Sequence, residues 1–376
     1  MGRSILTPFN MQEKECGFMN ERRKLIIHGT IAIAIGFILA LLPMLNIQTS
    51  SSSISGTHGG LSTGALDFMG DTAITRAWSR DHGMTLQANH VTLEQMVDAN
   101  LGQHDFFISD TRLIGDVLNT TQHWNSARIG VSPLVILAWN EVRDTLVSNG
   151  IAATLDSRVH HLNMHKFIQL INTSNWDDLN PELPRVPVNI LAPDPVLTGT
   201  GFTYAEILLM TLAGVEQPTR DDALRHGDEI VSLLQHNNLT EQEVLRRFLE
   251  RQSPLVALPE NMIIAFVRAN PQVWEEHLNG RITVLYPTPT VWMEYSFHPS
   301  DTSTNWSARS SFNQAVWDTA SLLWEDFGIR DGTWRKNIDA LHLVRLGIIP
   351  EVPSASSFAG FQTTTRLYEV LREGRR

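Results

Sequence analysis

The chain is poor in cysteine and in basic residues, and each shortage excludes a class of function. Cys16 is its only cysteine, so an intramolecular disulfide and zinc sites built on cysteine pairs are excluded. Lys and Arg number 29 against 40 Asp and Glu, which gives a net charge of -11, and no run rich in Lys and Arg follows the N-terminal segment. Because binding to nucleic-acid phosphates needs clustered basic residues, no nucleic-acid partner is expected.

Two common enzyme motifs are missing as well. The chain contains neither the G-x-x-x-x-G-K-[ST] pattern of a P-loop nor the H-E-x-x-H pattern of a zinc protease. Hydrophobic residues still make up 42% of the 376 residues, enough for one large or two ordinary folded domains. We therefore expect a folded protein that is not an enzyme and that carries no cofactor and no metal.

One apolar run, Leu25–Leu45, has the properties of a membrane-spanning helix. It contains no Asp, Glu, Lys or Arg, and at about 1.5 Å per residue it reaches roughly 30 Å, the thickness of a bilayer core. Arg22, Arg23 and Lys24 precede it, and no charged residue follows until Asp67. The positive-inside rule then places residues 1–24 in the cytoplasm and the C-terminal part outside the membrane.

A cleaved signal peptide and a buried core helix are the alternatives for this run. Its apolar length exceeds that of most signal-peptide cores, and it is apolar all the way round. The anchor is therefore the favoured interpretation. The following residues, 46–64, are rich in Ser, Thr and Gly and predict a flexible linker.

From Ala65 onward, short apolar runs alternate with stretches of helical spacing. Strands are predicted at Ala65–Met69, 84–91, Asp105–Asp110, Val131–Trp139, Val186–Asp194 and Arg281–Pro287. Helices are predicted at Ala73–Asp81, Thr92–Asn100, 140–150, 202–215, within Asp221–Leu249, late in Ser253–Asn270, and near 309–327, 333–346 and 363–373. This alternation indicates an α/β fold with a mainly parallel sheet.

Five segments occur in an order that points to a known family. They read FMGDTAITRAW, TLEQMVDANLGQHDFFISD, ARIGVSPLVILAW, ILAPDPVLTGTGFTYAEILL and ITVLYPTPTVWMEYSFHP. From about Ala65 to the C-terminus, the chain resembles bacterial extracellular solute-binding proteins with the type II periplasmic fold. It is most similar to the branch that includes molybdate-, sulfate- and phosphate-binding proteins, and to relatives that often carry a von Willebrand A domain.

The resemblance implies two lobes that close around a ligand. The first lobe would consist of residues 65–132 and 287–376, and the second of residues 133–286. In open α/β sheets, ligands lie beyond the carboxyl ends of strands, at helix N-termini. One turn from each lobe fits this rule, Gly70-Asp71-Thr72 and Thr198-Gly199-Thr200-Gly201. Glycine lets the backbone approach a ligand, and free N–H groups there favour an anion.

The candidate ligand-binding residues share small size, a hydroxyl group or a place at a strand end. They are Gly70, Asp71, Thr72, Ser109, Thr111, Ser132, Thr198, Gly199, Thr200, Gly201 and Tyr286. The same residue types are favoured in ordinary caps and turns, so a structural role is the alternative for each.

Asp71 departs from the pattern of the oxyanion-binding relatives, which usually have a small neutral residue at this turn. A carboxylate would repel an anion or compete with it for the same N–H groups. Either Asp71 caps its helix, or the ligand is neutral or cationic.

The cluster of His160, His161 and His165 is interpreted as a solvated helix face rather than a metal site, because it has no evident third ligand.

The sequence thus predicts a membrane-anchored, extracytoplasmic protein that captures a small polar solute, possibly an oxyanion. The partners would be an ABC-type permease, or a sensor or von Willebrand A-domain protein. The alternative is a scaffold or sensor that keeps the fold without a ligand.

Overall fold

The structure is a computed structural model that describes residues 57–82, 86–98, 104, 106–122, 126–155, 159–171, 173–234, 238–299, 314–330, 341–350, 352, 355–356 and 360–375. These residues all belong to one compact unit, Ser51–Arg376. The predicted cytoplasmic segment, the membrane-spanning segment Leu25–Leu45 and the linker as far as residue 56 lie outside the described residues. No helix in the described part is long and apolar enough to cross a membrane.

The strands are β1 (Thr57–Leu61), β2 (Leu86–His90), β3 (Phe106–Ser109), β4 (Ala127–Trp139), β5 (Ala152–Leu155), β6 (Val159–Asn163), β7 (Leu255–Pro259), β8 (Ile282–Thr288), β9 (Thr290–Pro299) and β10 (Ala355–Ser356).

The helices are α2 (Thr63–Met69), α3 (Thr72–His82), α4 (Leu93–Val97), α5 (Arg112–Gln122), α6 (Asn140–Ser148), α7 (Met164–Ile168), α8 (Trp176–Leu179), α9 (Gly199–Ala213), α10 (Arg220–Leu233), α11 (Glu241–Leu249), α12 (Glu260–Ala269), α13 (Pro271–Val273), the π-helical turn η3 (Trp274–Leu278), α15 (Ala320–Phe327), α16 (Leu341–Leu346) and α17 (Phe361–Gly374).

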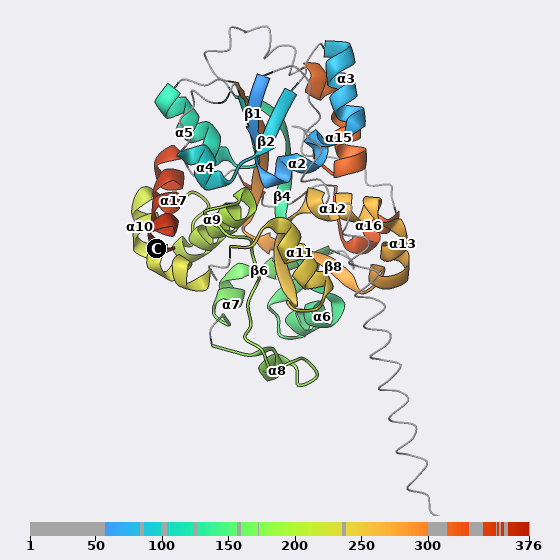
Figure 1. Cartoon of the computed structure of the whole chain (residues 1–376). Coiled ribbons are helices and arrows are strands. Elements are labelled where there is room, and N and C mark those ends of the chain that lie inside the picture. Colours follow the sequence, from blue (N-terminus) through green and yellow to red (C-terminus); the bar gives the residue numbers. More distant parts are fainter. Residues whose placement is uncertain are drawn as a thin grey trace, which may run out of the picture. The chain divides into compact units, whose positions relative to one another are not determined.

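Strand β4 connects two groups of strands (Figure 1). Its first half, Ala127–Pro133, pairs with β9 in a sheet of order β2-β1-β3-β9-β4, which we call the first sheet. Its second half, Leu134–Trp139, lies between β7 and β8, and β8 continues to β6 and β5; we call this group the second sheet. Every residue from Val131 to Trp139 is buried, as expected for a strand covered on both faces.

The sheets are mixed, so the prediction of a mainly parallel arrangement is wrong. Strand β1 runs parallel to β2 and β3, and β6 runs parallel to β8. Strand β9 is antiparallel to both of its neighbours in the first sheet, and β4 is antiparallel to β7 and β8. The chain leaves the second sheet along β8 and enters the first sheet as β9. This strand lies between β3 and β4 and runs antiparallel to both.

Two local predictions at the start of the fold are wrong. Thr57–Leu61, predicted as linker, forms β1, and Ala65–Met69, predicted as a strand, lies in α2. Gly59 and Gly60 are typical of linkers, which explains the prediction. In the structure, aromatic rings of β3 pack directly on β1, and a Cβ on Gly59 would lie 2.3 Å from the ring of Phe106. Glycine is therefore required in this strand.

The predicted strand Val186–Asp194 is extended but pairs with its neighbours only through single bridges, at Pro187 and at Leu191. Proline has no N–H group to donate, and Pro187 and Pro193 fall within this segment, which explains why it forms no regular strand. The predicted strands within 84–91, Asp105–Asp110, Val131–Trp139 and Arg281–Pro287 are confirmed, as are the helices that correspond to α3, α4, α6, α9, α10, α11, α12 and α17.

Helix α9 lies in the centre of the fold and is buried from Gly199 to Thr211. It contacts α10, β7 and β9, so it touches strands of both sheets. A helix that is apolar on all faces must be buried on all faces. This burial holds the N-terminus of α9 in one place relative to the first sheet.

A buried ion pair joins the second sheet to the segment that follows β9. Arg330 and Glu260, both inaccessible to solvent, form two hydrogen bonds of 2.7 and 3.0 Å between guanidinium and carboxylate. Arg330 also donates to the carbonyl oxygens of Ile349 and Pro350, and the Tyr286 hydroxyl donates to Glu260 at 2.5 Å. Together these bonds satisfy both charges in the interior.

Removing one member of this pair should destabilise the protein strongly. E260A leaves the Arg330 cation buried and unpaired, which costs about 3–5 kcal/mol of the free energy of unfolding, measured by urea denaturation. The double variant E260L/R330M should lose less than the sum of the single variants, because no charge remains unpaired. D81A, which breaks the exposed Arg80–Asp81 pair, is the control and should leave stability nearly unchanged. Equal losses in E260A and D81A would contradict this assignment.

Candidate ligand-binding site

The turn before α9 is built by side chains that bond to its own backbone. Thr198 is the N-cap, and its hydroxyl oxygen accepts the Gly201 N–H at 3.0 Å while its O–H donates to the Asp194 carbonyl at 2.9 Å. A Cβ on Gly201 would lie 2.3 Å from the carbonyl oxygen of Pro193. Glycine is therefore required at position 201 by the packing of the turn itself, independently of any ligand.

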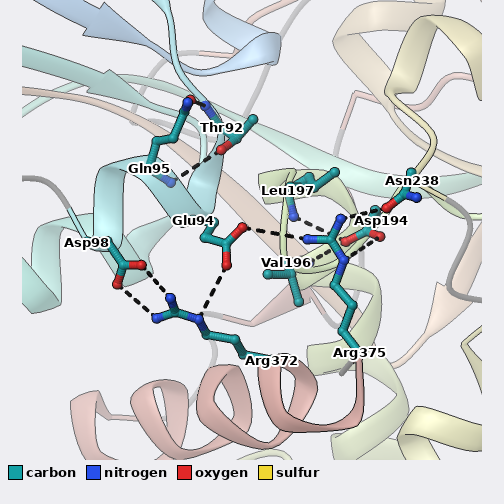
Figure 2. A network of polar contacts seen from close by, with 10 residues as sticks. All are labelled: Thr92, Glu94, Gln95, Asp98, Asp194, Val196, Leu197, Asn238, Arg372 and Arg375. Carbon is teal, nitrogen blue, oxygen red and sulfur yellow. Dashed lines mark hydrogen bonds and ion pairs between the residues drawn. The ribbon is translucent and has the colours of Figure 1, made fainter.

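Asp194 fixes the same turn from the inside. Its fully buried carboxylate accepts the N–H groups of Val196 at 2.9 Å and Leu197 at 3.3 Å. Arg375, from the end of α17, approaches the other carboxylate oxygen at 3.7 Å and also donates to Asn238 (Figure 2). The turn that precedes α9 is thus held by the C-terminal helix.

Helix α17 also reaches the first sheet through α4. Figure 2 shows Arg372 pointing at Asp98 and Glu94, with two bonds of 2.8 and 2.5 Å to Asp98 and a contact of 3.3 Å to Glu94. The backbone adds a hydrogen bond of 2.8 Å from the Leu93 N–H to the Leu197 carbonyl. These contacts hold the α9 turn against the helix that follows β2.

Asp110, directly after β3, lies against the first residue of α9. A Cβ on Gly199 would lie 2.2 Å from its Oδ1 atom, so glycine is needed there to make room for the carboxylate. The other oxygen, Oδ2, accepts the Gly64 N–H of α2 at 3.3 Å. Asp110 is only 1% exposed, and it lies between Gly64 and Gly199 at the N-terminus of α9, a kind of place that favours an anion.

Burial raises the pKa of Asp110 to about 6 from its ordinary value of 3.8, although neighbouring hydrogen-bond donors, among them the Gly64 N–H, oppose the rise. Desolvation disfavours the charged carboxylate, and the hydrogen bonds favour it. Because desolvation has the larger effect, the charged form of Asp110 is costly inside the fold.

A small pocket of about 20 Å³ lies beside this point. It is lined by Thr111 and Arg112 after β3, by Arg128, by Thr203 and Glu206 of α9, and by Trp292–Glu294 of β9. Thr111 accepts the Leu113 N–H at 3.3 Å and so caps α5. Thr200 is fully buried, and its hydroxyl faces the Met293 sulfur at 4.0 Å. Burial, followed by the nearby Asp116 charge, raises the pKa of Glu206 well above its ordinary value.

The Ser109 hydroxyl contacts a buried histidine. Its hydroxyl donates to the Thr111 carbonyl at 3.1 Å and lies 2.8 Å from Nε2 of His298, whose Nδ1 is 2.7 Å from the Ser126 hydroxyl. Burial lowers the pKa of His298 to about 3, so the ring is neutral.

Gly70, Asp71 and Thr72 do not join this site. They form the connection between α2 and α3, at the opposite end of α2 from Gly64, because the preceding segment is a helix and not a strand. Asp71 accepts the N–H groups of Ala73 at 2.7 Å and Ile74 at 3.0 Å. It therefore caps α3, which is the first of the two explanations offered for its charge.

Ser132 and Tyr286 have structural partners. The Ser132 hydroxyl accepts the Asn261 N–H at 3.0 Å and so caps α12, while Tyr286 bonds to Glu260 in the buried ion-pair network. The neighbouring Tyr295 hydroxyl donates to the Asn261 side chain at 3.0 Å and lies 3.1 Å from the position of a Cβ on Gly64. Ser132 thus lies close to the site, through Asn261 and Tyr295.

One turn at this place was not among the predicted ones: Ser62-Thr63-Gly64, which follows β1 and opens α2. A signal was present, because Gly60–Gly64 reads G-x-S-x-G, a pattern typical of sharp strand-to-helix turns that present a serine. In this fold the Ser62 hydroxyl is buried and has no hydrogen-bond partner among the described residues.

The three histidines do not form a group. His160 and His161 are successive residues of β6, so they point to opposite faces, and His165 lies on α7. Among the described residues, no three metal-ligating side chains come together. A larger pocket of about 440 Å³, lined in part by His165, Thr211 and Glu229, lies at the far end of α9.

Two mixed sheets are joined by β4, and turns from both meet at the start of α9. The described part of the chain therefore has the type II periplasmic-binding-protein fold, as predicted. A periplasmic thiamin-binding protein is similar, with a TM-score of 0.55, 10% identity, and coverage of 87% of this chain and 99% of that protein. The periplasmic binding protein AfuA from Actinobacillus pleuropneumoniae, with fructose-6-phosphate bound, gives a TM-score of 0.51 at 11% identity, covering 85% and 97%.

An ABC transporter protein from Clostridium perfringens is also similar, with a TM-score of 0.50 at 13% identity, covering 85% of this chain and 98% of that one. No family model and no curated protein matches the chain. At these identities the likeness concerns the fold.

The titration of Asp110 should be visible in the stability of the protein. Between about pH 4 and 6 the folded chain binds a proton at Asp110 that the unfolded chain has lost, so stability falls as pH rises through this window, by up to roughly 3 kcal/mol. D110N should abolish this dependence. The Tm difference, D110N minus wild type, should be smallest at pH 4 and grow to a plateau at pH 7.

His298 acts in the opposite direction, because its lowered pKa costs stability as pH falls below about 6.5. Its contribution is the same in both proteins and cancels in the difference. A Tm difference that stays constant from pH 4 to 7 would show that Asp110 does not titrate in this range.

Proposed function

We propose that the chain is an extracytoplasmic solute-binding protein that holds a small polar solute between two lobes for an ABC-type transporter or a sensor. The first lobe would comprise residues 65–132 and 287–376, extended at its start by β1, and the second residues 133–286. The proposal is supported by the fold and by the nature of the similar structures, two of which are periplasmic binding proteins.

One observation carries the proposal. The N-terminus of α9, which packs against β7 of the second sheet, points at the turn after β3 of the first sheet, so that Gly199 and Asp110 touch. Ligands of open α/β folds lie at this kind of place, beyond strand ends and at helix N-termini. The two segments that would act as the hinge are the middle of β4, at Pro133–Leu134, and the connection between β8 and β9.

We expect the solute to bind polar groups at the start of α9 that are not fully hydrogen-bonded within the protein. Thr200 is buried at the start of α9, and the only hydrogen-bond partner of its hydroxyl among the described residues is the distant Met293 sulfur. Its O–H can therefore bond to a solute at little cost to the fold. Opening of the two lobes would expose Thr200, Asp110 and Thr111 together.

A solute screen by thermal shift tests the proposal directly. A ligand at 100 times its Kd should stabilise the protein by about 2.7 kcal/mol, and small-angle X-ray scattering should show a smaller radius of gyration with ligand bound. T200V should weaken binding at least tenfold, with the free protein's Tm little changed. T211V, on the same helix and bonded to the Ile207 carbonyl instead, is the matched control. A broad screen without any shift would contradict the proposal and support a ligand-free scaffold.

We further propose that Leu25–Leu45 anchors the protein in the membrane, with residues 1–24 in the cytoplasm. The support is the basic flank Arg22-Arg23-Lys24 before an uncharged run. The full chain should resist extraction by alkaline carbonate, and protease added to intact spheroplasts should degrade the domain. R22E/R23E/K24E should reduce the fraction of correctly oriented chains. Release of the domain as a shortened soluble form would instead identify a cleaved signal peptide.

A further inference from the structure

We infer that Asp110 determines the charge of the solute: its carboxylate excludes oxyanions from the start of α9 and selects a solute with a cationic group, such as a primary or quaternary amine. The inference rests on the proposed function and names the class of ligand for the same site. It replaces the oxyanion expected from the resemblance of the sequence.

The geometry places the carboxylate where an anion would bind. Oδ1 would lie 2.2 Å from a Cβ on Gly199, the first residue of the buried fifteen-residue helix α9, and Oδ2 accepts the Gly64 N–H at 3.3 Å. An incoming anion would therefore find this position filled and the Gly64 N–H already engaged.

The charge of Asp110 opposes an anion beyond this steric effect. Two like unit charges about 4 Å apart at an effective dielectric constant of about 20 repel enough to lower affinity by a factor on the order of 10³. Since Asp110 is 99% buried, water screens it little. An anion that approached the α9 turn would meet this repulsion in full.

Asp110 has no counter-ion among the described residues, which points to a cation as ligand. Buried charges in folded proteins are normally paired with an opposite charge. Glu260 follows this rule through Arg330, whereas the Asp110 carboxylate accepts the neutral Gly64 N–H. A cationic solute would supply the positive charge that Asp110 lacks among the described residues.

Three proteins test the inference: wild type, D110N, which removes the charge at constant size, and D110S, which also vacates the space. The full chains are titrated at pH 8 by calorimetry with sulfate, phosphate and molybdate, and with ethanolamine, choline and putrescine. Wild type should bind at least one amine and no oxyanion. D110N should bind that amine at least 100-fold more weakly, and D110S should gain oxyanion binding by at least 100-fold over wild type.

D71S is the matched control. It makes the same substitution at a carboxylate that caps α3 away from the site, and serine still serves as a cap; it should keep the wild-type preference. Circular dichroism confirms that each variant is folded. Oxyanion binding by wild type equal to that of D110S would overturn the inference and leave the proposed function intact. Failure of all three proteins to bind any solute, in this panel and in the broader screen, would overturn both.

Discussion

The whole fold depends on one strand that belongs to two sheets. Because Ala127–Pro133 of β4 pairs with β9 and Leu134–Trp139 pairs with β7 and β8, the register of this strand positions both groups of strands. Burial of α9 against strands of both groups then directs its N-terminus to the end of β3. The candidate site follows from these two constraints, and the α17 contacts with α4 and Asp194 reinforce them.

Two buried carboxylates, those of Glu260 and Asp110, differ in whether a positively charged side chain is paired with them. Glu260 is paired with Arg330 and joins α12, β8 and the segments around Arg330 and Ile349, so its charge contributes to the architecture. Among the described residues, Asp110 has no cationic partner, and burial raises its pKa. A charge kept in the interior without a counter-ion costs stability, and costs of this kind are typical of functional sites. This contrast supports the proposal that Asp110 belongs to a binding site.

Most elements with a clear period were predictable, and the failures have local physical causes. The apolar run of β4 and the helical spacing of α9 predicted a strand and a helix there, and the structure buries β4 from Val131 to Trp139 and α9 from Gly199 to Thr211. Strand β1 was predicted as linker because it contains Gly59 and Gly60. Glycine is typical of linkers as well as of strands on which aromatic rings pack. Because of that error, the turn after the first strand was predicted at Gly70–Thr72, whereas the structure has it at Ser62–Gly64.

The sequence by itself determined the class of fold and most of its helices and strands, because periodicity and turn residues act locally. Tertiary structure alone decided which turns meet. The contact of Asp110 with Gly199 joins residues 89 positions apart, and the capping role of Asp71 depends on where α2 ends. Such contacts arise from strand order and helix burial, which no short stretch of sequence encodes. For the same physical reason, the charge of the site became visible only in the folded chain.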